Sequence, residues 1–566
     1  MQAEESYDAI VVGAGAGGLA AACVAAAEGL KTLLVEKSAL VGGTAACSGG
    51  MVWIPANAKM AASGIPDSVD GARRYLDQCA PPMRDPAARE AFLARGTEAL
   101  EYLEARTVLR LRPVVNYPDY YPGLPGATLG GRVLEPLDFD ARTLGRDFAL
   151  LRWPLREFML FDGMMVARPD LPHLRNALRS PRSALRALRL VGEYAWQRMS
   201  APRGTHLVLG NALVGRLLKS ALDLGVSLRL GAPVVRVVMR AGRAAGVEIE
   251  FGAQRTTIGA RAGVVLATGG FSHDPELRAL LLPSEVSPHS PVCPESTGDG
   301  IRMGLAAGGQ VGGHNTQNAF WAPMSHFRRA DGSECVFPHT VADRGKPGII
   351  AVTREGVRFT SEAVSYHEFV LAMLRANRTG AAIPAFLMCD RRSLWQYGLG
   401  AVRPFTFSRA PYLESGYLVR ARSIAGLAAR LEIDPAGLER TVATYNEDAR
   451  RGVDAQFGIG SNPYQRYLGD ARNRPNPCMR PIEAPPYFAV RLYPSDLGTV
   501  AGLVTDAEAR VLDGEGRPVP NLYACGNDMN SIMDGAYPGP GITLGPALVF
   551  GYVAGRALAR TPRAAS

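Results

Sequence analysis

The sequence lacks the features typical of secreted proteins, of proteins with structural metal sites and of membrane-spanning proteins. Its 566 residues include only 8 cysteines, which lie far apart, with no Cys-x-x-Cys pair and no Cys/His spacing typical of a zinc site. No run approaches the roughly 20 apolar residues of a membrane-spanning helix, and the acidic N-terminus has no signal-peptide pattern. We therefore expect reduced thiols, no metal site and a cytoplasmic protein.

The charge and composition are those of an ordinary globular protein. The chain has 62 Lys and Arg residues against 53 Asp and Glu residues, a net charge of +9, and 47% of its residues are hydrophobic. No basic module interleaved with aromatic residues accompanies the positive charge, so we expect no nucleic-acid partner. The length allows two to four structural units, or one large domain with an insertion.

A strand, a glycine-rich turn and a helix open the chain. The segment Tyr7 to Lys37 has the hydrophobic pattern of a β-α-β unit, and its turn contains Gly13-x-Gly15-x-x-Gly18. The first glycine allows a tight turn, the second lets the backbone approach a pyrophosphate, and the third lets the helix pack closely. Glu36 ends the next strand, where a carboxylate can accept hydrogen bonds from ribose hydroxyls. This context predicts a dinucleotide site.

Further glycine-rich segments indicate that the dinucleotide is long. Two of them follow the β-α-β unit directly, and two more end apolar strands much later in the chain. One elongated cofactor, FAD, would reach all four. The predicted cofactor-binding residues are Gly13, Gly15, Ala16, Gly17, Gly18, Glu36, Lys37, Gly42, Gly43, Thr44, Ser48, Gly49, Gly50, Val235, Ala267, Thr268, Gly269, Gly526, Asn527, Gly541, Thr543 and Leu544.

Motifs spread over almost the whole chain resemble the fumarate reductase/succinate dehydrogenase flavoprotein superfamily. They are Glu36-Lys37, Gly42-Gly43-Thr44, Ser48-Gly49-Gly50, Ala267-Thr268-Gly269-Gly270, Gly298-Asp299-Gly300, Arg358-Phe359 with Glu362, and Gly526-Asn527. Within that superfamily, the segments Ser48 to Asn57, Asp119 to Pro122 and Tyr537 to Pro546 are most similar to 3-ketosteroid dehydrogenases, which desaturate ring A of a steroid.

The resemblance and the order of predicted elements imply an α/β fold. We expect a Rossmann-like FAD-binding domain built from residues 1–279 and 486–566. An inserted α+β substrate-capping domain is expected over 280–485, and a helical, Arg-rich insertion over 139–203. The active site should lie over the flavin, where the two domains meet.

The resemblance also implies which groups bind the substrate ketone. It places the phenol of Tyr537 and the backbone N–H of Gly541 on the ketone oxygen, where they would stabilise a developing enolate. A second tyrosine of the family, which assists the base, corresponds to Tyr120 or Tyr121.

The proton-abstracting base is left open. The family uses a tyrosine of the capping domain, but no tyrosine lies between Cys293 and Ser365. The candidates are Tyr366, His367 and His326, of which we favour the adjacent pair Tyr366 and His367.

The implied reaction removes two vicinal hydrogens beside a ketone, the proton to a base and the hydride to the flavin. The loop 539–548 contains no arginine that could bind a carboxylate, which argues against fumarate or succinate as the substrate. The segment 44–47 contains no histidine for covalent attachment of the flavin, so we expect FAD to be dissociable. We expect a hydrophobic, steroid-like substrate, desaturated at the Δ1 or the Δ4 bond, and an external acceptor such as a quinone. The alternatives are an ene-reductase acting on an enone or enoate, and a flavin-binding protein without catalysis.

The Arg-rich insertion contains a basic amphipathic segment over 174–196. Five arginines share one helix face and four leucines lie on the neighbouring face, with Pro181 as an interruption. We favour a surface helix packed on the core by its leucines; the alternative is peripheral contact with the inner face of an anionic membrane, aided by Tyr194 and Trp196. These arginines and leucines are Arg175, Arg179, Arg182, Arg186, Arg189, Leu174, Leu178, Leu185 and Leu188.

Overall fold

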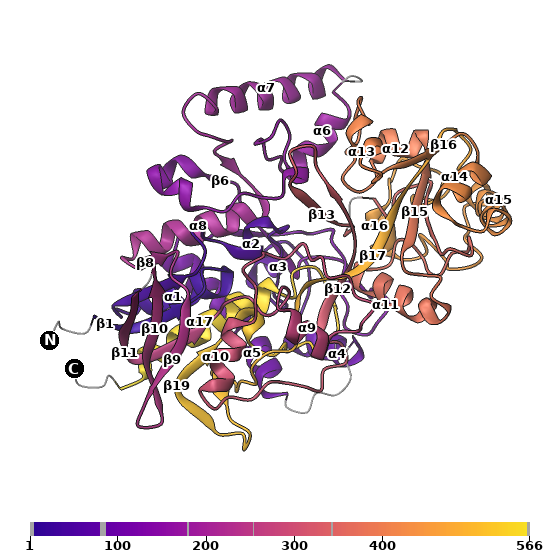
Figure 1. The fold of residues 1–566 in the computed structure, drawn as a ribbon. Helices are drawn as coiled ribbons and strands as arrows, with labels where there is room; N and C mark the ends of the chain where they lie inside the picture. Colours follow the sequence, from indigo (N-terminus) through magenta and orange to yellow (C-terminus); the bar gives the residue numbers. More distant parts are fainter. Residues whose placement is uncertain (1–4, 80–85, 178–179, 253, 341–342, 563–566) are drawn as a thin grey trace.

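The computed structural model describes residues 5–79, 86–177, 180–252, 254–340 and 343–562 (Figure 1). Two sheets organise this part of the chain, one of eight strands and one of six. Within it, no helix is both long and apolar enough to cross a bilayer. All eight cysteines fall in the described part and are unpaired.

The first sheet is built by three separate parts of the sequence. Its main order is β18-β19-β11-β1-β2-β8, with β10 and β9 extending from β11. The strands β19, β11, β1, β2 and β8 run parallel, so their carboxyl ends meet at one edge. The bounds are β1 Ser6–Val12, β2 Thr32–Glu36, β8 Ser227–Leu230, β9 Val234–Arg240, β10 Arg243–Phe251, β11 Gln254–Leu266, β18 Arg510–Leu512 and β19 Pro518–Ala524.

Helices cover this sheet closely because their contact faces are made of small residues. Helix α1 (Ala16–Ala27) packs against α8 (Leu209–Asp223) and α17 (Leu544–Arg560), and α17 also contacts α5 (Ala87–Arg106). A Cβ at Gly551 of α17 would stand 2.5 Å from the carbonyl oxygen of Gly17 in α1, so only glycine fits there. This arrangement confirms the predicted α/β class.

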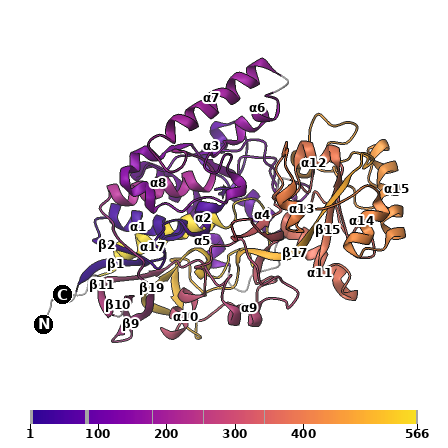
Figure 2. The same cartoon turned by 45° about the horizontal axis from the view of Figure 1, so that its top comes forward.

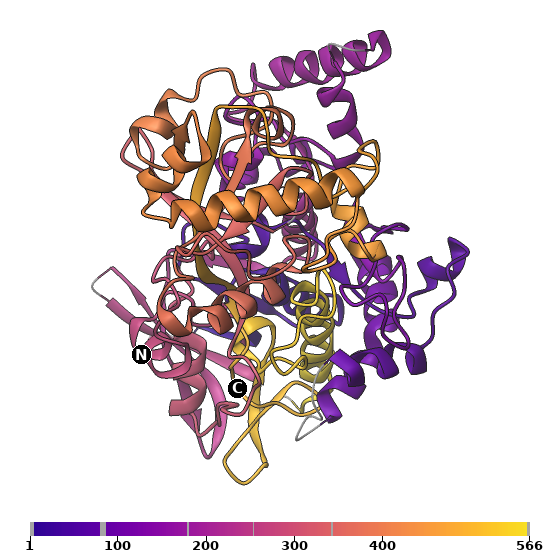
Figure 3. The ribbon, with the colours of Figure 1, turned by 90° about the vertical axis from the view of Figure 1, so that its right-hand side faces the viewer.

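The second sheet is antiparallel and has the order β13-β12-β17-β15-β14, with β16 also paired to β17. It lies with its helices to one side of the first sheet (Figures 2 and 3). The bounds are β12 Ala319–Arg328, β13 Glu334–Pro338, β14 Ile349–Val352, β15 Ala385–Asp390, β16 Val419–Ala421, β17 Tyr487–Thr499, α11 Tyr366–Ala376, α12 Arg391–Tyr397, α13 Ala410–Glu414, α14 Ile424–Leu431, α15 Pro435–Arg451 and α16 Pro463–Leu468.

Strand β17 does not pair with the sheet to which the expected domain boundary at residue 486 would assign it. This strand lies in the middle of the second sheet, bonded to β12, β15 and β16, whereas the sequence analysis assigned it to the FAD-binding part. Its 13 residues are long enough to pair with β15 in the first half and with β12 in the second. The chain therefore returns to the first sheet only at β18.

Short elements fill the connections, including the glycine-rich segment 38–57. That segment contains α2 and β3. The remaining bounds are α2 Gly43–Cys47, β3 Val52–Trp53, α3 Ala58–Ala62, α4 Val69–Cys79, β4 Leu111–Pro113, β5 Val133–Pro136, β6 Phe139–Asp140, α6 Leu171–Arg175, α7 Pro181–Gln197, β7 His206–Leu207, α9 Pro275–Leu281 and α10 Asp299–Ala306, with 3-10 turns at Ala141–Leu150, Arg156–Phe158, Arg168–Asp170, Asn377–Thr379 and Gly526–Asp528.

Helix α7 lies at the periphery of the molecule (Figures 1 and 2). Pro181 begins this helix behind the N-cap Ser180, which explains the predicted interruption. Leu185 and Leu188 are each 70% exposed, so the favoured expectation that the leucines pack on the core is wrong. The inner face is formed instead around the buried Ser183. Leu178, Arg179 and the side chain of Arg175 lie outside the described residues.

Candidate active site

A cavity of about 310 Å³ lies at the carboxyl edge of the first sheet. The turns after β1, β2, β11 and β19 line it together with the segment 43–51 and the start of α17. The remaining lining residues come from the segments 117–120, 152–158, 232–234, 291–303 and 338–340, together with Tyr366, Leu497 and Tyr537. The cavity therefore lies between the parallel sheet and the second sheet, as the sequence predicted for the active site.

Most of the predicted cofactor-binding residues line this cavity. They come from four separate stretches of sequence that the parallel strands bring to one edge. The lining residues among them are Gly13, Gly15, Ala16, Gly17, Glu36, Lys37, Gly43, Thr44, Ser48, Gly49, Gly50, Ala267, Thr268, Gly269, Gly526, Asn527, Gly541, Thr543 and Leu544.

Three predicted residues, Gly18, Gly42 and Val235, do not line the cavity. A Cβ at Gly18 would stand 1.9 Å from the carbonyl oxygen of Gly13, so this glycine serves close packing of helix on strand. Gly42 has a φ of 124° and shapes the turn into α2. The side chain of Val235 is 37% exposed, and Val234 lines the cavity instead because successive side chains of a strand point to opposite faces.

Glu36 and Lys37 are held at the end of β2. The Glu36 carboxylate accepts hydrogen bonds from the main-chain N–H groups of Ala14 and Ser38, each at 2.8 Å, and burial raises its pKa. The Lys37 ammonium donates to Asp299 at 2.7 Å and to Thr297 at 2.5 Å. Lys37 is thus neutralised by the aspartate of the Gly298-Asp299-Gly300 motif.

The shape of the nucleotide end fits an elongated dinucleotide. Helix α1 has no side-chain cap on its first N–H groups, and a Cβ placed on Gly15 or Gly49 would meet no atom within 4 Å. Main-chain donors at a helix start are the preferred partners of a pyrophosphate. At the far end, α17 also starts without a side-chain cap, and the N–H of Gly541 donates no hydrogen bond to the described part of the chain. The main-chain N–H groups at the two helix starts would hold FAD.

Four tyrosines from distant segments form the other end of the site. The ring of Tyr537 lies 5.0 Å from that of Tyr366 and 5.6 Å from that of Tyr120, measured between centroids. Tyr120 in turn lies 5.7 Å from Tyr366 and 4.7 Å from Tyr464. Tyr120, Tyr366 and Tyr537 line the cavity. The structure thus brings together three of the residues that the sequence analysis named as catalytic.

Burial sets the proton affinity of these phenols. It raises the pKa of Tyr537 to about 12, while a hydrogen bond with Tyr366 lowers it in part. Burial raises the pKa of Tyr366 well above its usual value, and the nearby Tyr120 hydroxyl counteracts this. The Tyr120 hydroxyl itself is buried and makes no well-aligned hydrogen bond within the described chain.

The remaining candidates for the base and its assistant do not line the cavity. His367 accepts a hydrogen bond at Nδ1 from the Trp321 N–H, and burial lowers its pKa to about 3, so the ring stays neutral. Tyr121 points to Glu368, to which its hydroxyl donates at 2.8 Å. His326 belongs to another cluster on β12, described below. Among these candidates, Tyr366 and Tyr120 line the cavity, and their rings lie 5.7 Å apart.

Sequence reasoning missed Arg344, which no motif marked. Its side chain is 1% exposed and donates to the carbonyl oxygens of His339, Thr340, Glu362 and Val364, at 2.7 to 3.2 Å. The structure records no ion pair of Arg344 with a carboxylate among the described residues. Its positive charge instead lowers the pKa of Tyr464 against the effect of burial.

Two further functional residues could have been found from their place beside a motif. Tyr117 lines the cavity, two residues before the Asp119 to Pro122 segment, and its ring stacks on Tyr467 at 4.4 Å. Asp528 directly follows Asn527 and accepts hydrogen bonds from the N–H groups of Thr268, at 2.5 Å, and Gly270, at 3.0 Å. Asp528 therefore ties the turn after β19 to the turn after β11.

Known proteins share this arrangement over nearly the whole chain. The model of a family described as FAD binding domain matches residues 8–544. The 4-oxocyclohex-2-ene-1-carboxylate 5-dehydrogenase of Sinomonas cyclohexanicum is 37% identical over 559 residues, which cover 98% of this chain and 94% of the relative. A 3-oxosteroid 1-dehydrogenase of Mycobacterium tuberculosis is 34% identical over 562 residues, which cover 97% of this chain and 98% of the relative.

A solved structure agrees with the sequence relatives. The crystal structure of 3-ketosteroid delta1-dehydrogenase from Sterolibacterium denitrificans, in complex with 1,4-androstadiene-3,17-dione, matches this chain with a TM-score of 0.92 and 37% identity. The match covers 98% of this chain and 99% of that one. Sequence and backbone therefore lead to the same group of proteins.

Proposed function

The chain belongs to the FAD binding domain family, within the superfamily of fumarate reductase flavoproteins and 3-oxosteroid dehydrogenases, and from this we propose a dehydrogenase that forms a double bond beside the ketone of a 3-ketosteroid-like substrate. The resemblance seen in the sequence is thus confirmed. The protein is an FAD-dependent oxidoreductase that acts on CH–CH bonds. We propose the Δ1 bond, because the relatives named above for a steroid are named for that position.

The lining of the cavity is the observation that favours a steroid over a keto acid. Its two cationic side chains are already paired, Lys37 with Asp299 and Arg152 with Glu295, each at 2.7 Å. A substrate carboxylate in the cavity would meet no unpaired cation among the lining residues, whereas an uncharged polycyclic ketone would lose little on burial. The aromatic and apolar lining residues include Met51, Tyr117, Tyr120, Leu155, Phe158, Pro338, Tyr366, Leu497 and Tyr537.

Arg168 lies over the ring of Tyr117, a lining residue, and it is also occupied. Its guanidinium donates to the Tyr467 hydroxyl at 2.8 Å and lies 3.4 Å from Glu135. The Arg168 side chain does not line the cavity. A 4-oxocyclohexanecarboxylate would therefore compete with Glu135 for this guanidinium.

The three lining tyrosines have different roles in the proposed reaction. Tyr537 stays protonated at physiological pH because burial raises its pKa to about 12, so its hydroxyl and the Gly541 N–H can donate to the ketone oxygen. Both donors stabilise the charge that develops on this oxygen when the adjacent carbon loses its proton. Tyr366 takes that proton, and the Tyr120 hydroxyl beside it stabilises the phenolate. Bound FAD supplies the hydride acceptor, and an external acceptor, for which we propose a quinone, reoxidises it.

Anaerobic absorbance titration of the FAD-loaded protein tests the substrate class. We expect 4-androstene-3,17-dione to bleach the flavin band and 4-oxocyclohexanecarboxylate to leave it unchanged. Bleaching by the keto acid alone would replace the steroid with a cyclic keto acid and keep the dehydrogenase. Bleaching by neither, with rapid reoxidation of dithionite-reduced protein by an enone, would indicate an ene-reductase. No response to any of them would leave a flavin protein without this catalysis.

We also propose that the outer face of α7 contacts an anionic membrane in which such a substrate dissolves. Leu185, Leu188 and Trp196 are each 70% exposed, and at 100° per residue they lie on one side of the helix. Met199, just beyond the end of the helix, is 69% exposed. Arg186 is tied to Asp170 at 2.8 Å, which fixes the helix on the protein with its apolar side outward. An apolar stripe with Trp, flanked by arginines, is typical of helices that lie in a membrane interface.

Liposome flotation tests this contact. The protein should float with vesicles that contain phosphatidylserine, less with phosphatidylcholine alone, and not after combined Leu188→Glu and Trp196→Glu substitution. Phe407→Glu is the matched control, since Phe407 is 86% exposed on another part of the surface. Absence of flotation by the unmodified protein would exclude membrane contact without affecting the proposed reaction.

A further inference from the structure

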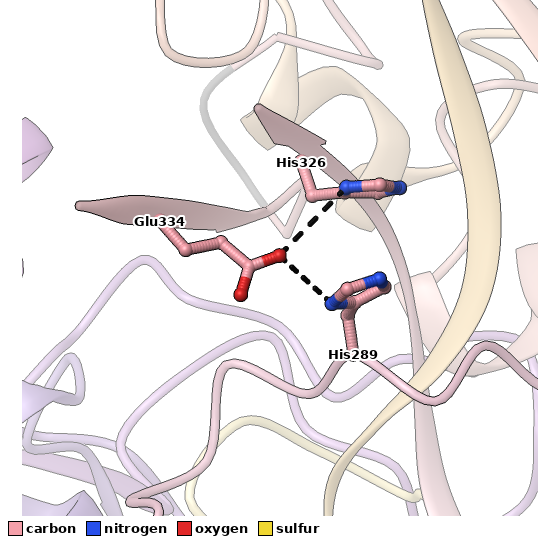
Figure 4. Close-up of side chains that lie close together, drawn as sticks. All are labelled: His289, His326 and Glu334. Carbon is pink, nitrogen blue, oxygen red and sulfur yellow. Dashed lines mark ion pairs between the residues drawn. The ribbon is translucent and has the colours of Figure 1, made fainter. Parts of the chain in front are cut away.

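A cluster of two histidines and one glutamate lies outside the cavity. His289 belongs to the connection between α9 and α10, His326 to β12 and Glu334 to β13 (Figure 4). Their side chains converge although the sequence analysis found no ligand spacing typical of a metal site. All three are half-buried to exposed, with side-chain exposures of 36%, 31% and 51%.

The backbone fixes two of the three side chains on one face of a hairpin. His326 pairs with Val336 across the antiparallel strands β12 and β13. Glu334 is two residues from Val336, so its side chain points to the same face of the sheet as that of His326. Their convergence therefore follows from the register of the hairpin.

Strand β17 fixes the position of His289, the third residue of the cluster. The Ser495 hydroxyl donates to the carbonyl oxygen of His289 at 2.9 Å, and the N–H of Ser287 donates to the carbonyl oxygen of Pro494 at 2.9 Å. Because β17 pairs with β12, this holds His289 beside His326, with ring centroids 4.3 Å apart.

The three ligand atoms lie near the spacing that a tetrahedral metal ion requires. Nδ1 of His289 lies 2.8 Å, and Nδ1 of His326 4.0 Å, from the same carboxylate oxygen of Glu334, and all three ligand atoms lie within 4.8 Å of one another. Zn²⁺ bonds of about 2.0–2.2 Å in tetrahedral geometry separate ligand atoms by roughly 3.4 Å. The observed separations bracket this value, so side-chain rotations would close the site.

A simple ion pair does not use all of these groups. Two imidazole rings, stacked at 4.3 Å between centroids, face the same carboxylate, so three possible ligand groups meet where an ion pair needs only two. Imidazole nitrogen and carboxylate oxygen are both ligand types that Zn²⁺ binds in proteins. His326 also packs on Tyr493, at 5.3 Å between rings.

We propose that His289, His326 and Glu334 bind one Zn²⁺ ion, with water as the remaining ligand. The ion would join the connection that carries Pro291 and Cys293 to the hairpin that continues to Pro338, and these three residues line the cavity. The site is thus structural, and it does not depend on the proposed reaction.

The test uses the untagged, FAD-loaded full chain, freed of metal with a chelator and titrated with ZnCl₂ by calorimetry at neutral pH. We expect one Zn²⁺ per chain, and at least about tenfold weaker binding for His326→Gln and for Glu334→Gln. The exposed His314, outside the cluster, provides the control His314→Gln, which should bind Zn²⁺ as the unmodified chain does.

Two further measurements test which residues bind the ion and whether it joins the two segments. Co²⁺ in place of Zn²⁺ should give the strong visible absorption of a tetrahedral site in the unmodified chain and lose it in His326→Gln. Hydrogen exchange should slow on Zn²⁺ addition in residues 287–296 and 334–338. No Zn²⁺ binding by the unmodified chain, or binding that neither cluster substitution weakens, would overturn the proposal.

Discussion

The two ends of the cavity are built in opposite ways. At the nucleotide end, main-chain groups of the glycine turns and of the start of α1 form part of the surface, together with the charged side chains of Glu36 and Lys37. At the ketone end, Tyr120, Tyr366 and Tyr537 meet from three segments that are far apart in the sequence, and their side chains form the surface.

Because of this difference, the two ends of the cavity should be damaged by different kinds of substitution. A main-chain surface depends on residues that have no side chain, so it is damaged by adding atoms. A side-chain surface depends on single hydroxyl groups, so it is damaged by removing one oxygen. The following predictions use this contrast, from the largest expected effect to the smallest.

Tyr366→Phe should have the largest effect on the reaction and little on cofactor binding. It removes the proposed base and leaves the ring, so we expect the rate of flavin reduction by steroid to fall about 10²–10⁴-fold. Stopped-flow absorbance gives this rate, and flavin content gives the control. A rate within threefold of the unmodified protein would remove Tyr366 from the mechanism.

Tyr537→Phe tests the donor to the ketone oxygen. Loss of one donor to a developing oxyanion costs about 10²–10³ in rate. The same stopped-flow experiment should show this loss in flavin reduction, again with full FAD content. An effect on steroid affinity alone, with an unchanged limiting rate, would make Tyr537 a binding residue only.

Glu36→Gln tests the nucleotide end by changing one charge. Hydrogen bonds to a charged group contribute about 1.5–3 kcal/mol each, so we expect FAD to bind roughly 10- to 150-fold more weakly. Fluorescence titration of the apoprotein with FAD measures this. The limiting rate of flavin reduction at saturating FAD should stay the same; a fall in that rate comparable to Tyr537→Phe would break the separation of the two ends.

The pH dependence distinguishes a tyrosine base from a histidine base. A base acts in its deprotonated form, and burial raises the pKa of Tyr366, so kcat/KM should rise up to tenfold per pH unit between about pH 6 and 9. Burial lowers the pKa of His367 to about 3, so it contributes no inflection in this range. Tyr537, with a pKa raised to about 12, remains a donor throughout. A plateau above about pH 7 would point to a histidine.

Tyr121→Phe is the matched control for its neighbour Tyr120. It removes a hydroxyl that donates to Glu368 at 2.8 Å outside the cavity. We expect an unchanged rate of flavin reduction and a loss of about 1 kcal/mol in the free energy of unfolding, from chemical denaturation. Tyr120→Phe should instead slow flavin reduction, and equal rates for both variants would contradict the assignment of Tyr120.

The nucleotide end could be predicted from the sequence because each of its parts is a contiguous motif. Gly13, Gly15 and Gly18 constrain one turn, and Glu36 follows at the end of the next strand, so local geometry decides their positions. Where the predicted and the observed lining residues differ, the cause is also local. Val234 rather than Val235 lines the cavity because alternation along a strand inverts with a shift of one residue.

The ketone end was predicted only as far as the resemblance extends. It indicated Tyr537 and a pair of tyrosines, but left open which member of Tyr120 and Tyr121, and which of Tyr366 and His367, faces the substrate. Arg344 could not be predicted, because an arginine that donates only to carbonyl oxygens has no sequence signature.

The sequence by itself determined the α/β class and the dinucleotide turn, since these follow from hydrophobic periodicity and from glycine turns that act within a few residues, and its motifs carried the family resemblance that implied the general chemistry. Only the tertiary structure decided the facing tyrosines, the outward apolar side of α7, the place of β17 in the second sheet and the convergence of His289, His326 and Glu334. The physical reason is that adjacent side chains point to different faces of an element, and long-range packing alone selects the face that is covered.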